Sequence, residues 1–268
     1  MFATAPDGKR KSASISLNKY TIEQAKEVEK AFKSAIKAGH QWVRPELPIK
    51  VPPPPPILKA FEHRDIFETN PPFKNGGVSF ALVGSTRSGK STALCAIYNF
   101  WFKKHITMLF TLSSHAEIYD CLKKKAIVCQ GYFPKMLKDA MKLNVDTGNK
   151  WPMLSIFDDL SSVGKTDSTM TRLLTTGRNS NQSVILSGQK LTMLSATGRS
   201  NVNYILCFRQ NSESAIEDTI KCYLRSYFPK NLNMGEMIDL YKKHTQDHQF
   251  FFVDALEDKC YLSKINLT

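Results

Sequence analysis

The sequence predicts an α/β fold in which a mostly parallel sheet is covered by helices on both faces. From Gly76 onward, short apolar and β-branched stretches alternate with segments of helical pattern, which is typical of parallel strands joined by helices. The first of these strands runs into a glycine-rich loop, and a helix follows the loop at once. We therefore expect a basic N-terminal extension over residues 1–75 and one α/β domain over residues 76–268.

The extension is expected to contain one helix. Residues 1–18 are polar and basic, and they predict disorder. Thr21 and Gln24 form a capping-box pattern, after which apolar residues recur at helical spacing as far as Ala38. Gly39 is a natural helix stop. One face of this helix should therefore dock on another surface.

A proline-rich segment follows this helix. Pro45, Pro48 and the run from Pro52 to Pro56 impose an extended polyproline conformation. The segment is either a stiff strap that leads to the α/β domain or a ligand for an SH3-type domain, and we favour the strap.

The sheet is expected to contain six strands and to end in a C-terminal β-hairpin. The strands are predicted at 78–83, 106–112, 126–130, 153–157, 183–187 and 203–208. Helices are expected at 212–225 and 233–243. The hairpin is predicted from Gln249–Val253 and Cys260–Ile265, with its turn near Glu257 and Asp258.

A phosphate-binding pattern, G-x-x-x-x-G-K-[ST], follows the first strand. The residues that fit it and are expected to bind nucleotide are Gly84, Ser85, Thr86, Arg87, Ser88, Gly89, Lys90, Ser91 and Thr92. Gly84 and Gly89 permit the tight backbone path that points several N–H groups at one anion. Lys90 would place its charge on the β- and γ-phosphates, and the Ser91 hydroxyl would bind Mg²⁺. The helix that begins here would point its positive end at the phosphates, so the expected ligands are ATP and Mg²⁺.

A second Gly-Lys-Thr triplet occurs at Gly164, Lys165 and Thr166. The position five before Gly164 is Asp159 rather than glycine, and no strand leads directly into the triplet. It therefore predicts an ordinary loop.

Two carboxylates end the strand at 153–157. In nucleotide hydrolysis, Asp158 would hold the Mg²⁺ shell and Asp159 would orient or deprotonate the attacking water. The alternative is a pair of acidic residues that merely begin a loop. A paired carboxylate favours a hydrolase over a small-molecule kinase, because a kinase transfers phosphate to an acceptor hydroxyl instead of water.

Gln189 follows the strand at 183–187 and is expected to lie at the carboxyl edge of the sheet. Ligands bind to open parallel sheets at this edge. Gln189 would sense the γ-phosphate or position water, although it could instead cap the next helix.

Arg178 and Arg199 each follow glycine in a Thr-Gly-Arg stretch, and both are expected near the catalytic edge of the sheet. An arginine supplied to a neighbouring subunit's nucleotide stabilises the charge on the transferring phosphoryl group. A structural role or a DNA contact is the alternative for each of them.

The amino-acid composition indicates which class of partner and which compartment to expect. The net charge of +13 favours a polyanionic partner, with nucleic acid ahead of an anionic membrane. No apolar run reaches the roughly 18 residues of a membrane span, and the polar N-terminus does not resemble a secretory signal. The six cysteines are scattered, so we expect reduced thiols in a cytosol-like compartment, with neither zinc nor disulfides.

Taken together, these motifs resemble the FtsK–HerA superfamily of DNA-pumping ATPases. The stretches that carry the resemblance, all within residues 76–225, are GSTRSGKS, MLSIFDD, TTGRNSNQSVILSGQ and GRSNVNYILCF. The match is closest to the packaging ATPases of large DNA viruses and virophages, the poxvirus-type branch. Arg87 stands where relatives commonly have glycine, and Asn179 stands where the viral branch usually has histidine.

The resemblance implies a RecA-like (ASCE) P-loop NTPase sheet with an extra strand between the two nucleotide-binding strands. It also implies a homo-oligomeric ring that moves double-stranded DNA into a preformed capsid, at a capsid or portal vertex, in the virion or a viral factory. By motif match, the phosphate loop would bind nucleotide, Asp158 and Asp159 would serve magnesium and water, Gln189 would be the sensor, and Arg178 or Arg199 would act across the subunit interface.

Other functions remain open at this stage. One is a different P-loop ATPase, such as a plasmid-transfer pump or a helicase. A second is a small nucleotide kinase, which would need an Arg-rich lid and an acceptor pocket that the sequence does not indicate. A third is a basic DNA-binding protein with a vestigial loop, against which the intact Lys90, Ser91, Asp158 and Asp159 argue.

Overall fold

The computed structural model describes residues 2–4, 6–7, 10–12, 22–40, 61–71, 73, 76–113, 117–160, 168–190 and 194–265. The chain divides into two compact units, Met1–Leu58 and Lys59–Thr268. Within the described residues, no helix has the length and apolar character that a membrane crossing requires.

The first unit contains α1, Ile22–Lys37, and two short strands, β1 (Phe2–Thr4) and β2 (Arg10–Ser12), which pair antiparallel. The prediction of disorder across residues 1–18 was therefore wrong at both strands, whose pairing the polar composition did not reveal. The predicted helix is confirmed, and its stop at Gly39 has the left-handed φ of +74°. The capping box at Thr21 and the proline-rich segment fall outside the described residues.

The second unit is built on an eight-stranded sheet with the order β10-β9-β8-β3-β7-β6-β4-β5. The strands from β8 to β5 in that order are parallel, and β9 and β10 form the antiparallel C-terminal hairpin. The strand bounds, which confirm all eight predicted strands, are β3 Ser79–Val83, β4 Ile106–Thr111, β5 Ala126–Gln130, β6 Met153–Asp158, β7 Gln182–Gly188, β8 Tyr204–Cys207, β9 Gln249–Asp254 and β10 Lys259–Lys264. The predicted extra strand is β7, which lies between β3 and β6.

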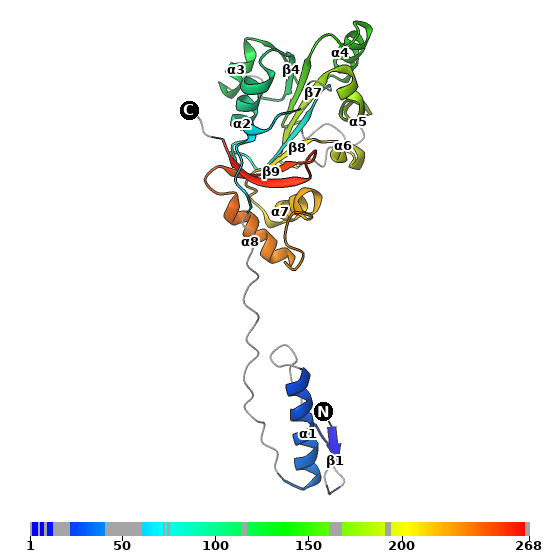
Figure 1. The fold of residues 1–268 in the computed structure, drawn as a ribbon, viewed down its shortest axis with the longest axis vertical. Coiled ribbons are helices and arrows are strands. Elements are labelled where there is room, and N and C mark those ends of the chain that lie inside the picture. Colours follow the sequence, from blue (N-terminus) through cyan, green and yellow to red (C-terminus); the bar gives the residue numbers. More distant parts are fainter. Residues whose placement is uncertain are drawn as a thin grey trace. The chain divides into compact units, whose positions relative to one another are not determined.

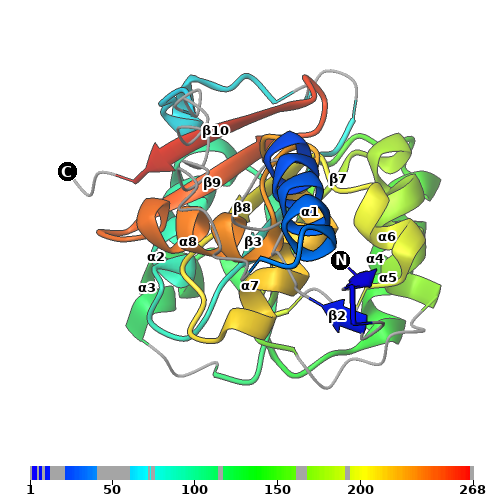
Figure 2. The same ribbon diagram turned by 90° about the horizontal axis from the view of Figure 1, so that it is seen from below.

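Helices cover both faces of this sheet, as predicted (Figure 1). One face is covered by η1 (Ile66–Glu68), α2 (Lys90–Ile97), η3 (Tyr98–Phe102), η4 (Glu117–Tyr119) and α3 (Asp120–Lys123). The other face is covered by α4 (Pro134–Asp146), α5 (Ser168–Thr176), η5 (Gly177–Ser180), α6 (Ala196–Ser200), α7 (Glu213–Thr219), η7 (Ile220–Leu224) and α8 (Met234–His244). Of these, α7 and α8 lie over β8 and β9 (Figure 2).

The alternation of side chains along β3 builds the two cores. Phe80 and Leu82 pack on the α2 and α3 side, whereas Ala81 and Val83 pack on the α4 and α5 side. All four are fully buried, because a central parallel strand has no solvent-facing side. The carboxyl ends of the parallel strands consequently meet at one edge of a rigid sheet.

Segments that precede β3 also belong to this unit. Leu262 of β10 donates its N–H to the Glu62 carbonyl, and Arg64 donates its N–H to the Leu262 carbonyl. Ile66 is completely buried in the core on the α2 side. The hairpin therefore anchors the chain that enters the sheet.

Candidate functional site

The loop between β3 and α2 adopts a path that particular residues impose. A Cβ on Gly84 would lie 2.7 Å from both the Phe208 Cβ and the Ser88 Oγ, so no larger residue fits there. Gly89, which caps α2, has a φ of +99°. Arg87 also has a left-handed φ, +60°, which explains why this position favours glycine and costs a non-glycine residue roughly 1 kcal/mol.

The loop is fastened to the end of β8. The Ser85 N–H and hydroxyl both donate to the Arg209 carbonyl, each at 3.0 Å. The same hydroxyl also lies 2.9 Å from the Asn211 Oδ1. The loop is therefore held open as a preformed cradle at the carboxyl edge of the sheet.

Lys90, the first residue of α2, points its ammonium back into this loop. Its Nζ donates to the Ser85 carbonyl at 2.9 Å, and the side chain is buried. Burial lowers the pKa of Lys90, while the charges of Asp159 and Asp158 act to raise it. The two carboxylates predicted from sequence therefore lie close enough to stabilise the ammonium.

Asp158 ends β6 at the same edge and is 1% exposed. The Tyr119 hydroxyl donates to its Oδ2, while its Oδ1 has no hydrogen-bond partner within the described part of the chain. Burial raises the pKa of Asp158 to about 6, against the lowering effects of Ser187 and Lys90. A buried carboxylate oxygen that lacks a donor is suited to a cation.

Asp159 and Gln189 lie at the rim of the cradle. Asp159 is exposed, has a φ of +51°, and donates its N–H to the Ser187 carbonyl. The Gln189 Nε2 donates to the Thr86 Oγ1 at 3.3 Å, so the structure places Gln189 directly against the phosphate loop.

The expected position of Arg178 and Arg199 was wrong. Arg178 lies in η5, immediately before β7, and its carbonyl accepts the N–H of Gly77 just ahead of β3. It therefore lies at the amino edge of the sheet, opposite the phosphate loop. Arg199 lies in the last turn of α6 ahead of β8, and its guanidinium donates to the Leu194 carbonyl at 2.9 Å. Both arginines were expected near the carboxyl ends of elements at the catalytic edge, whereas each lies in a helical turn that precedes a strand.

Sequence reasoning missed Tyr119 and a cavity beside the phosphate loop. The cavity encloses about 430 Å³ and is lined by Arg87, Gly89, Thr92, Ala93, Phe208, His248, Phe250, Lys264 and Ile265. Its aromatic wall comes from β8 and β9, which are remote from the loop in sequence. The aromatic content of the hairpin was a sequence signal for the cavity, whereas no pattern pointed to Tyr119.

Among the described residues, no group of three or more His, Cys, Asp or Glu side chains could hold a metal ion. All six cysteines are free thiols. The oxygens suited to a divalent cation are the Asp158 carboxylate and the Ser91 hydroxyl, so such an ion would draw its other ligands from a phosphate and water. The Gly-Lys-Thr triplet at residues 164–166 falls outside the described residues.

Comparison with known proteins gives one family match. The profile of the family named Poxvirus A32 protein matches residues 69–263, which is most of the chain. Among curated proteins, a sequence search returns no match.

Several solved structures share the fold. B204, the genome packaging NTPase from Sulfolobus turreted icosahedral virus 2, in complex with sulfate, has a TM-score of 0.54 at 14% identity and covers 72% of this chain and 98% of its own. B204, the DNA-packaging ATPase from Sulfolobus turreted icosahedral virus, has a TM-score of 0.53 at 15% identity. The match covers 72% of this chain and 100% of that chain. ATPases 2 and 3 of EssC from Geobacillus thermodenitrificans have a TM-score of 0.50 at 12% identity and cover 73% and 40%. The fold is therefore that of a P-loop NTPase.

The raised pKa of Asp158 has a measurable consequence for stability. Because the folded protein retains this proton to higher pH than the unfolded chain does, ionisation of Asp158 lowers the free energy of unfolding as the pH rises from about 4 to 7. We expect Asp158→Asn, which cannot ionise, to match the wild type near pH 4. At pH 7 it should be more stable by on the order of 3 kcal/mol, the equivalent of a shift from 3.8 to about 6. Denaturant titrations across this range would measure the difference, and a difference that does not change with pH would contradict the expectation.

Proposed function

The chain belongs to the poxvirus A32 protein family, and on this premise we propose that it is an ATP-driven translocase that packages double-stranded viral DNA into a preformed capsid. The observation that carries the proposal is the convergence of Lys90, Asp158 and Gln189 on one phosphate loop. This set provides a cation for the phosphates, a carboxylate for a metal and a polar sensor at the rim. The genome-packaging role of B204, which shares the fold, supports the assignment of packaging.

The phosphate loop binds the triphosphate in this proposal. Backbone N–H groups of residues 86–87 and 89–90 surround the β-phosphate, since those of Gly84, Ser85 and Ser88 already donate to carbonyls. The amino end of α2 adds its positive dipole. Lys90 exchanges its bond to the Ser85 carbonyl for the β- and γ-phosphates. The negative charge of a bound triphosphate also raises the pKa of Lys90, which opposes the lowering that burial causes.

Asp158 and Ser91 hold Mg²⁺ at the end of the triphosphate. When bound, the ion would supply positive charge that offsets the charge of the phosphates. Asp158 must be ionised to bind the metal ion. The hydrogen bond from Tyr119 to Oδ2 fixes the orientation of the carboxylate, so Oδ1 is available to the ion.

Asp159 acts on the attacking water, and Gln189 senses the γ-phosphate beside it. Asp159 lies at the solvent side of the cradle, close enough to Lys90 for a charge interaction, so it can accept the proton that water loses. Gln189 already contacts the loop through Thr86, and its amide can reach the γ-phosphate and report whether it is present.

The cavity beside the loop takes the purine base. It adjoins Thr92 and Ala93 of the first turns of α2, and Phe208 and Phe250 supply an apolar wall. His248 lies at its margin, with its Nδ1 3.6 Å from the position of a Cβ on Gly89. A ring there can stack on a base.

The proposal includes a homo-oligomeric ring in which one subunit supplies an arginine to its neighbour's nucleotide. An arginine at the amino edge lies too far from its own phosphate loop to act there, which suits a role in trans. Arg178 is the stronger candidate, because it is exposed and forms no ion pair with described residues, whereas Arg199 is tied to Leu194. The remaining parts of the proposal are double-stranded DNA and a capsid or portal vertex as partners, and a site of action in the virion or viral factory.

The direct test is ATP hydrolysis with and without double-stranded DNA. The wild type should hydrolyse ATP faster when DNA is added.

Lys90→Ala should abolish nucleotide binding, because the buried triphosphate loses its main countercharge. Binding of a fluorescent ATP analogue would show this. Asp159→Asn should keep that binding and lower kcat at least about a hundredfold, the scale of general-base assistance. Normal hydrolysis by Asp159→Asn would show that the assignment of Asp159 is wrong.

The base pocket makes a separate prediction. His248→Asn removes the ring but suits the left-handed backbone at this position, φ +60°. We expect it to raise the KM for ATP about fivefold with little change in kcat, because contacts to the base are equal in the ground and transition states. His63→Asn, at an exposed histidine outside the cavity, is the matched control. An unchanged KM would remove His248 from the base site.

The arginine in trans is tested by mixing two inactive proteins, Arg178→Ala and Lys90→Ala. In a mixed ring, some interfaces pair an intact nucleotide site with an intact Arg178, so hydrolysis should return at concentrations where the protein assembles. If the mixture stays inactive although both variants co-assemble, Arg178 does not act in trans, and the same mixture made with Arg199→Ala tests the alternative.

A further inference from the structure

A groove runs along the outer surface between α4 and α5, away from the phosphate loop. It encloses about 750 Å³ and is lined by Lys138, Asp139, Met141, Lys142, Val145, Asn149, Ser168, Thr169, Arg172, Thr176, Asn179 and Ser180. We propose that this α4–α5 groove binds the phosphate backbone of double-stranded DNA. The inference rests on the proposed function and adds to it the surface that contacts DNA.

The charges in the groove are uncompensated. Lys138, Lys142 and Arg172 are exposed, and none of them forms an ion pair with a carboxylate in the described residues. Asp139 is the one acidic residue of the lining, so three cations face a single carboxylate. By contrast, lysines elsewhere on this unit, such as Lys190 and Lys242, have acidic partners within 3.1 Å.

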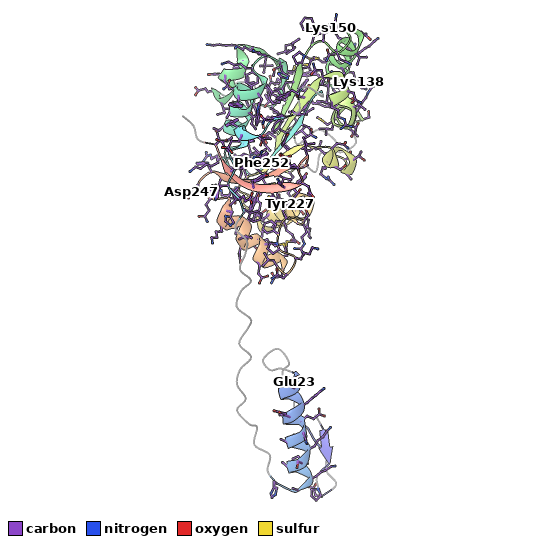
Figure 3. The ribbon with its side chains drawn as sticks, in the orientation of Figure 1. Glu23, Lys138, Lys150, Tyr227, Asp247 and Phe252 are labelled. Carbon is purple, nitrogen blue, oxygen red and sulfur yellow. The ribbon has the colours of Figure 1, made fainter. Side chains whose placement is uncertain are left out.

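The spacing of the cations suits a DNA strand. Lys138 and Lys142 lie four residues apart on α4, about 6 Å along the helix axis, and so on the same side of the helix. Arg172 faces them from α5 across the groove. Lys150, beyond the end of α4, extends the basic surface on the same side of the unit (Figure 3). Charges on both sides of a groove can contact phosphates of a strand that lies between them without reading the sequence.

The other lining residues match the same ligand. Ser168 contributes a hydroxyl and Asn179 an amide, groups that commonly donate to phosphate oxygens, whereas Thr176 and Asn149 already donate to the carbonyls of Arg172 and Asn179. The lining also has a substantial apolar part, which includes Val145 and Met141. Three cations without ion pairs among the described residues, beside a single carboxylate, attract a polyanion, so we favour DNA over a neighbouring subunit.

The test measures affinity for a 30-base-pair duplex by fluorescence anisotropy between about 50 and 200 mM salt. The groove variant is Lys138→Ala/Lys142→Ala/Arg172→Ala. Loss of three phosphate contacts should weaken binding at least about tenfold at low salt and reduce the slope of log K against log salt by about 2.7. The matched control, Lys103→Ala/Lys104→Ala/Lys243→Ala, removes the same charge from exposed lysines outside the groove and should bind nearly as the wild type does.

A charge-preserving variant, Lys138→Arg/Lys142→Arg/Arg172→Lys, should retain the wild-type affinity, and thermal unfolding should show that all variants are folded. Equal weakening in the groove and control variants would overturn the inference, because net charge alone would then explain binding. Wild-type affinity in the groove variant would also overturn it. A groove variant that binds DNA normally but fails to self-associate would identify the groove as a subunit contact instead. Failure of the wild type itself to bind DNA would count against the proposed function and not against the groove alone.

Discussion

The position of β7 between β3 and β6 is the constraint on which the candidate site depends. Val83 pairs with Gly188, and Asp158 pairs with Ser187, so the three strands end level with one another. Two inter-strand spacings, about 10 Å, then separate the root of the phosphate loop from Asp158. Lys90 and Asp158 interact through their charges but form no salt bridge, and Lys90 bonds to the loop instead. The sheet thus keeps open a gap in which a phosphate and a cation can lie between the two groups.

This arrangement is unfavourable for the empty protein, and the rest of the fold holds it in place. Asp158 is buried, with Oδ1 unpaired among the residues that the structure describes. Lys90 is buried with a lowered pKa, and Arg87 adopts a left-handed conformation. Such features persist only where the surroundings over-determine them. Here stacked rings brace the strands on both faces, with Phe80 against Tyr204 at 4.9 Å and Phe110 against Phe157 at 5.0 Å. Ligand binding would therefore lower a free-energy cost that core packing offsets in the absence of the ligand.

The sequence predicted the strands, the hairpin and the phosphate loop well, because these depend on local patterns. Apolar alternation identifies strands, and the glycines of the loop are required by its backbone path. The sequence did not predict Tyr119 beside Asp158, since 39 residues separate them and no pattern links a short helix after β4 to the end of β6. It also misplaced Arg178, because a Gly-Arg stretch looks alike at the exit of one strand and at the entrance of the next. The pairing of β1 with β2 was missed because strands of three residues are too short to show alternation.

The proposed roles of the phosphate loop and of Arg178, at opposite edges of the sheet, would constrain how copies assemble. A subunit that binds nucleotide at the carboxyl edge and supplies an arginine from the amino edge uses two different surfaces at each contact. Such a contact is heterologous, so it cannot be satisfied by a two-fold dimer, and it closes only when successive rotations complete a ring. The α4–α5 groove runs across the sheet between these two edges, because both helices return the chain from the carboxyl to the amino edge. Its ends therefore approach both of the surfaces that neighbouring subunits would share. Suppose that DNA binds along this groove. A shift of one subunit against the next during ATP hydrolysis would then also move the DNA phosphates bound in the groove. A translocase requires this coupling between hydrolysis and DNA movement.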